Sequence, residues 1–79
     1  MERTVSQVFT NHNVLSVTVK NTTDGETRVK IIFEDLAGTK MSVNNEPMDR
    51  IKLEFTGAAE RETLLEGLKM IVTELETYK

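Results

Sequence analysis

The sequence predicts an α+β fold: an antiparallel β-meander of four to five strands, followed by one long C-terminal amphipathic helix packed on one face of the sheet. Two patterns carry this prediction. Residues 4–56 alternate between apolar and polar side chains and are interrupted by turn residues, as half-buried strands are. Residues 57–78 instead repeat their apolar side chains every three or four positions, which is the period of a helix. A chain of 79 residues is long enough for one domain, which we assign to residues 1–79.

Alternation places the strands at about residues 4–9, 14–20, 26–34, 39–44 and 49–56. The first strand is the least regular, because Gln7 lies between Val5 and Phe9. This strand either joins the same sheet, as an edge, or pairs with another subunit. Asp24-Gly25 is a strong hairpin signal between the second and third strands. Short connections favour pairing of strands in sequence order.

The expected helix over about residues 57–78 has a continuous apolar stripe on one side, formed by Leu64, Leu68, Ile71, Leu75 and Tyr78. Arg61 also falls on this side. Either it extends its charge to solvent at the rim of the sheet, or it contacts an anion or a partner. Gly67 flanks the stripe, and it indicates either a close backbone approach or a tolerated exposed glycine.

Composition limits the classes of protein that the chain can represent. Cysteine is absent, which excludes disulfides, thiolate metal sites and thiol nucleophiles and favours a reducing compartment. We expect a cytoplasmic protein, because there is no long apolar run and Met1-Glu2-Arg3 is unlike a signal peptide. The net charge of −3 disfavours indiscriminate binding to nucleic acid.

No group of residues indicates catalysis. His12 is the single histidine and falls in a predicted turn, so neither a histidine metal site nor a serine–histidine pair can be assembled. The neighbouring acids Glu34-Asp35 and Glu46/Asp49 lie at strand ends and in loops, where solvated carboxylates are common. We therefore predict a non-enzymatic protein without a cofactor, a metal or a catalytic site.

One charge distribution stands out on the predicted outer face of the sheet. Alternation points six of the ten basic residues to that face, which makes it a candidate site for an anion or a partner: Lys20, Arg28, Lys30, Lys40, Arg50 and Lys52. Only Glu34 and Glu54 oppose them, so the expected formal charge is about +4. The ordinary alternative is a solvated face whose lysines protect the sheet against aggregation. All three phenylalanines are predicted to point inward, which leaves this face without an aromatic platform for base stacking.

The order of elements, a meander followed by one long helix with a basic sheet face, is similar in outline to the PC4-type transcriptional coactivators. That resemblance implies binding of single-stranded DNA by a dimer. The acidic pI of about 5.1 departs from that family.

Three functions follow from these observations, in order of preference. The first is a small non-enzymatic interaction module that acts through protein–protein contacts as a homo-oligomer, with a homodimer preferred. The second is a single-stranded nucleic-acid-binding protein that uses the basic outer face. The third is an enzyme or small-ligand binder whose site lies at a subunit interface near Arg61 and His12. No membrane partner is expected.

Overall fold

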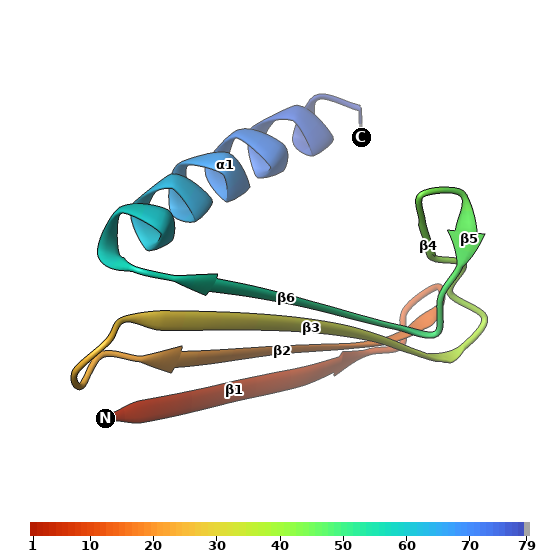
Figure 1. Cartoon of the computed structure of the whole chain (residues 1–79). Coiled ribbons are helices and arrows are strands. Elements are labelled where there is room, and N and C mark those ends of the chain that lie inside the picture. Colours follow the sequence, from red (N-terminus) through yellow and green to blue (C-terminus); the bar gives the residue numbers. More distant parts are fainter. Residues whose placement is uncertain (79) are drawn as a thin grey trace.

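The computed structural model describes residues 1–78 and confirms the α+β fold (Figure 1). Four antiparallel strands form the main sheet, two short strands form a separate small sheet, and one helix follows them. In chain order the elements are β1 (Glu2–Phe9), β2 (Val14–Thr22), β3 (Arg28–Ala37), β4 (Ser42–Val43), β5 (Glu46–Pro47), β6 (Arg50–Thr56) and α1 (Ala58–Thr77).

The main sheet has the strand order β1-β2-β3-β6, so its strands pair in the order in which the chain supplies them. Its register aligns the odd-numbered residues on one face, as in the row Val5–Val19–Ile31–Leu53. The even-numbered residues point to the opposite face, because side chains alternate along a strand. β1 pairs within the chain and is an edge strand, which is one of the two alternatives left open by its sequence pattern.

The predicted strand over residues 39–44 is wrong. Only Ser42–Val43 is extended there, and it pairs with Glu46–Pro47 in the small sheet rather than with the main sheet. The reason is local turn chemistry: Asn44 and Asn45 have φ values of 53° and 70°, the left-handed pair that a two-residue hairpin turn requires. The segment is thus part of the connection that lets β3 reverse and pair directly with β6.

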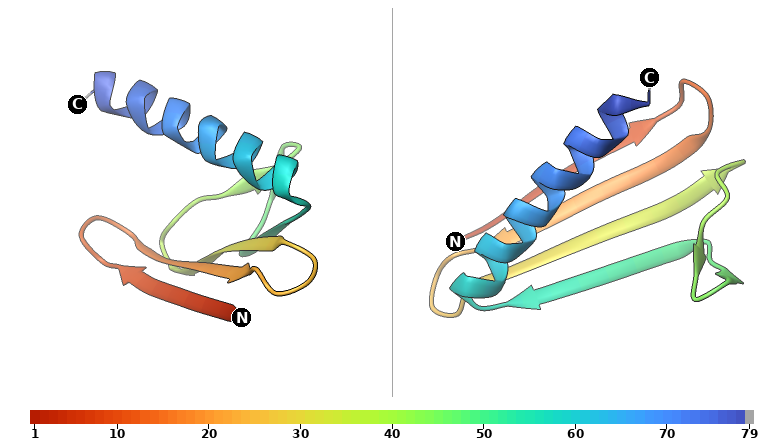
Figure 2. Two further views of the ribbon diagram at one scale, coloured as in Figure 1. Left: turned by 90° about the vertical axis from the view of Figure 1, so that its left-hand side faces the viewer. Right: turned by 90° about the horizontal axis from the view of Figure 1, so that it is seen from above.

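Helix α1 begins directly after β6 and covers the odd-numbered face of the sheet. Gly57 links the two elements with φ 115° and ψ 154°, a conformation essentially restricted to glycine. From there α1 crosses the strands diagonally, and its C-terminal end stands away from the sheet (Figure 2). No helix within residues 1–78 has the length and apolar character needed to cross a membrane.

The core lies under the first half of α1. Val29 and Ile31, both on β3, are the buried apolar residues. The predicted packing of the helix on the sheet is therefore limited to its N-terminal part, where α1 contacts β6 and β3. The remainder of the apolar stripe does not reach the sheet.

Candidate functional site

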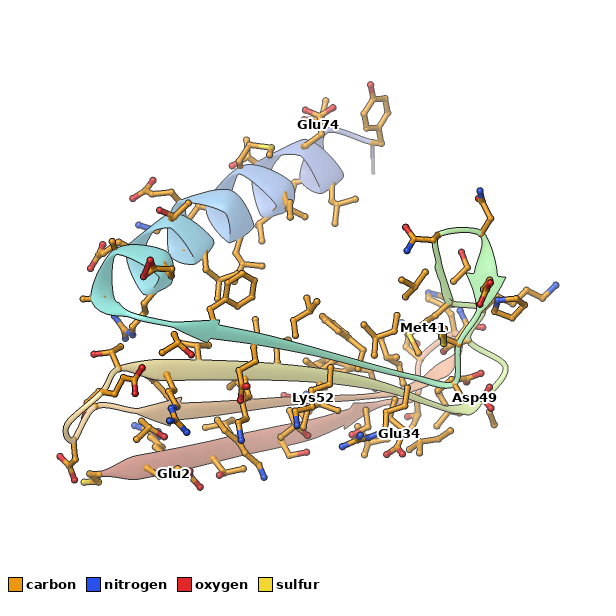
Figure 3. The ribbon with its side chains drawn as sticks, viewed as in Figure 1. Glu2, Glu34, Met41, Asp49, Lys52 and Glu74 are labelled. Atoms are coloured by element: carbon orange, nitrogen blue, oxygen red, sulfur yellow. The ribbon has the colours of Figure 1, made fainter. Side chains whose placement is uncertain are left out.

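The structure brings five of the six predicted basic residues together on the even-numbered face of the main sheet. Lys20 lies on β2, Arg28 and Lys30 on β3, and Arg50 and Lys52 on β6. This face points away from α1, as Figure 3 shows for Lys52 together with the acidic residues Glu2 and Glu34. We call these five side chains the basic face.

Lys40 does not belong to the basic face. It follows Gly38, whose φ of 86° turns the chain out of the main sheet, and it lies outside all strands. There it lines a hollow of about 380 Å³ between residues 35 and 49, together with Asp35, Asp49 and Met41. The alternation that placed Lys40 on the outer face assumed a strand that does not form.

The charge of this side of the sheet is also lower than expected. Besides Glu34 and Glu54, it carries Glu2 at the start of β1, so five basic and three acidic side chains give a formal charge of +2 rather than about +4. Two of the basic residues are paired: Lys30 Nζ lies 3.4 Å from Glu54 Oε2, and Arg28 lies 3.5 Å from Glu26. Within residues 1–78, Lys20, Arg50 and Lys52 form no ion pair.

Lys20 and Lys30 are directly opposite each other on β2 and β3. Two like charges in that position repel each other and destabilise the pairing of their strands. The basic face also lacks the three phenylalanines, because Phe9, Phe33 and Phe55 all lie at odd-numbered positions of β1, β3 and β6. The face is thus suited to contacts with phosphate or carboxylate groups and not to stacking on bases.

The opposite, apolar side of the sheet is open along one flank. Along the apolar stripe of α1, the exposed fraction rises from 39% at Leu68 to 46% at Ile71 and 69% at Leu75. On β1, which lies at the far edge from β6, Val5 and Phe9 are 48% and 47% exposed. We call these five residues the open apolar side. Leu53, on the other edge strand, is 43% exposed and lies outside this group.

The whole chain is less compact than a folded monomer of its size. A 9.0 kDa monomer exposes about 4,900 Å² of surface, whereas this chain exposes 6297 Å². Its radius of gyration is 14.0 Å, against about 12 Å for a compact domain of this length. The excess of about 1,400 Å² lies within the range that one subunit buries in a permanent dimer.

A small apolar hollow of about 160 Å³ marks where α1 begins to separate from the sheet. It is lined by Val19 and Ile31 from the sheet and by Leu65 and Leu68 from the helix. Arg61 closes one end, where its Nε donates a hydrogen bond of 3.4 Å to Asn21 Oδ1. Arg61 is therefore half-buried at the rim of the sheet and has a hydrogen-bond partner within the chain.

His12 and Arg61 do not approach each other within the chain. His12 lies in the turn between β1 and β2, with Nε2 3.3 Å from Asn11 Nδ2, whereas Arg61 contacts Asn21 near the other end of β2. Strand geometry separates the two ends by about 25 Å. Residues 1–78 contain no cluster of three histidine, aspartate or glutamate side chains able to hold a metal ion.

The sequence interpretation treated the residues of the open apolar side as ordinary core and so did not single them out. Their apolar period is correct for a core, and only the course of α1 away from the sheet exposes them. The length of the stripe was a usable signal, because it continues to Leu75 and Tyr78 although the sheet has only four strands. In comparisons with known proteins, no family model, curated protein or solved structure matches this chain.

Proposed function

We propose that this chain is a non-enzymatic interaction module whose working form is a homodimer, with the open apolar side as the surface of self-association. The observation that carries the proposal is the progressive exposure of the stripe on α1 above the exposed apolar side chains of β1. Burying apolar surface stabilises by about 25 cal/mol for each Å², so leaving this surface in water forgoes a large part of the available stability.

A second copy of the chain fits this surface better than an unrelated partner for two reasons. The excess exposed surface, about 1,400 Å², is of the size that one subunit of a permanent dimer buries. The five residues of the open apolar side carry no charge, although Arg3 lies on the same face of β1, and interfaces of permanent homodimers are the most apolar class of protein contact. The proposal includes a cytoplasmic location, which the absence of cysteine supports.

Sedimentation equilibrium on the 79-residue chain tests the proposal. The wild type is expected to have the mass of two chains. The double substitution Ile71→Glu, Leu75→Glu places two charges in the stripe and is expected to give one chain with a helical circular-dichroism signal retained. Met70→Glu is the matched control, because Met70 is an exposed apolar residue of α1 that lies off the stripe. A wild type that stays monomeric at high micromolar concentration refutes the proposal.

The second candidate function is binding of a single-stranded nucleic acid through the basic face. The direct opposition of Lys20 and Lys30 favours it, because a phosphate placed between two ammonium groups removes their repulsion. Such binding has little sequence preference, since it rests on phosphate contacts without stacking.

Fluorescence anisotropy of a labelled mixed-sequence single-stranded DNA at about 50 mM and about 200 mM salt tests this candidate. Binding is expected to weaken steeply over that range and to be lost in Lys20→Gln, Lys52→Gln. Lys69→Gln on α1 is the control, because it removes a positive charge away from the basic face. No saturable binding by the wild type at the lower salt concentration leaves the face as a protein contact or a solvated surface.

A further inference from the structure

The outer edge of β1 has unpaired backbone groups, and it lies on the same flank of the molecule as the open apolar side. The Thr23 N–H donates to the Met1 carbonyl at 3.2 Å, and this hydrogen bond fixes the phase of the β1–β2 ladder. Backbone groups of odd-numbered residues in β1 therefore face β2. Those of Glu2, Thr4, Ser6 and Val8 point outward, along an edge that has no partner strand within residues 1–78.

The two edge strands of the sheet differ in how well they are protected against pairing with another strand. On β6 the outward backbone groups belong to Arg50, Lys52, Glu54 and Thr56, since Asp35 N–H donates to the Asp49 carbonyl at 2.7 Å and sets the phase there. Charged side chains on an edge strand, such as those of Arg50, Lys52 and Glu54, disfavour pairing of that edge with another strand. β1 instead presents Glu2, Thr4, Ser6 and Val8, of which Glu2 alone is charged. Its register with β2 is continuous over all eight residues, and it contains neither proline nor lysine. An edge of this kind is open to pairing.

We propose that two copies of this chain pair their β1 strands in antiparallel fashion across a twofold axis, so that the two sheets become one sheet of eight strands. The inference rests on the proposed homodimer and specifies its geometry. Pairing supplies hydrogen-bond partners to the outward groups of β1 and places the two apolar faces side by side under both helices. The C-terminal part of α1 extends toward the β1 side of the sheet (Figure 2), which directs its exposed stripe to the junction.

The phase of the edge limits the possible registers of the new pair. Only even-numbered residues have free backbone groups, so hydrogen-bonded pairs across the axis must join even with even, which also keeps the apolar faces aligned. With the axis at Val5, Thr4 pairs with the partner's Ser6, and residues 2–8 of the two β1 strands face each other. Val5 then opposes the partner's Val5 on the apolar face, in the closely spaced non-hydrogen-bonded position where β-branched side chains contact well. Shifting the axis to Ser6 would instead set Val5 against the polar Gln7.

A proline substitution in β1 tests the pairing of the two β1 edges separately from the other contacts of the proposed dimer. Thr4→Pro removes an outward N–H that β2 does not use, so the monomer fold is retained while the new ladder is interrupted. Lys52→Pro makes the same change on the outer edge of β6 and is the control. We expect Thr4→Pro to sediment as one chain and Lys52→Pro as two. A Thr4→Pro chain that remains dimeric overturns edge pairing but leaves the homodimer intact, whereas a monomeric wild type removes both.

A single introduced cysteine tests the register, because the chain has no cysteine of its own. With the axis at Val5, the Cβ atoms of the two Val5 residues lie about 5 Å apart, close to the separation that a disulfide spans. Under mild oxidation Val5→Cys is expected to form a covalent dimer. Gln7→Cys is the matched control, since its two copies are separated by four residues, or about 13 Å. Crosslinking of Gln7→Cys in preference to Val5→Cys, or of neither, overturns this register.

Discussion

Truncating Ile31 and Leu53 separately to alanine and comparing the two losses of unfolding free energy measures how unevenly α1 covers the sheet. The two residues are directly opposite each other on β3 and β6 and have side chains of the same size, but Ile31 is 8% exposed and Leu53 is 43% exposed. Truncation of a buried isoleucine to alanine removes its burial and leaves a cavity, so we expect Ile31→Ala to lower the free energy of unfolding by about 3 kcal/mol. Leu53→Ala should cost roughly half of that, about 1.5 kcal/mol, because nearly half of the side chain is already in water.

Urea denaturation followed by circular dichroism gives both values, provided that all variants are measured at one protein concentration. That condition matters because the stability of a dimer depends on the concentration of its subunits. An equal loss in the two variants would refute the reasoning, since it would mean that β6 is covered as fully as β3 in solution. A loss above about 2 kcal/mol for Leu53→Ala alone would point to a contact at the β6 edge instead of the β1 edge.

Three further substitutions test local features of the fold. Gly57→Ala should lower the free energy of unfolding by about 1–3 kcal/mol, because the φ of 115° is strained for other residues and the added Cβ would collide with the Glu60 carboxylate. Thermal denaturation measures this loss, and an unchanged melting temperature would contradict this geometry. Gly67→Ala should raise the free energy of unfolding by roughly 1 kcal/mol, since no atom apart from the adjacent residues and the local helix backbone lies within 4 Å of the new Cβ. Destabilisation would indicate that a partner approaches α1 there. Lys20→Thr should stabilise by about 0.5 kcal/mol at low salt through loss of the repulsion from Lys30, and the gain should disappear at about 1 M salt, where the Debye length is about 3 Å.

Much of the main sheet could be predicted from alternation, because in a half-buried strand the polarity of each residue indicates the face of the sheet on which it lies. The strong Asp24-Gly25 turn and the short connections led to the correct pairing of β1, β2 and β3 in sequence order, whereas β3 then pairs with β6 and not with the expected strand over residues 39–44. The segment after β3 was predicted wrongly because Met41 and Val43 alternate with polar residues over too short a range to separate a strand from a hairpin. Asn44-Asn45 was the informative signal, since two adjacent residues with positive φ close a hairpin.

The candidate sites, too, could be predicted from the sequence only in part. Five residues of the basic face could be assigned from the sequence, because their strands were correct, and Lys40 could not, because its strand was not. The net charge of that face required the register of β1, which adds Glu2. The free edge of β1 required the complete strand order, since every strand has unpaired backbone groups until its neighbours are known.

By itself, the sequence determined the four strands of the main sheet and the helix, which residues of each of these strands share a face, and which side of the helix is apolar. These are local properties, set by periods of two and of 3.6 residues. The tertiary structure alone decided how far the helix follows the sheet and which strand edge remains free. Both depend on the direction in which α1 leaves Gly57 and on the pairing of strands distant in sequence. The period of the apolar residues indicates that a side chain is suited to burial, and only the arrangement of the elements determines whether this chain buries it or leaves it exposed.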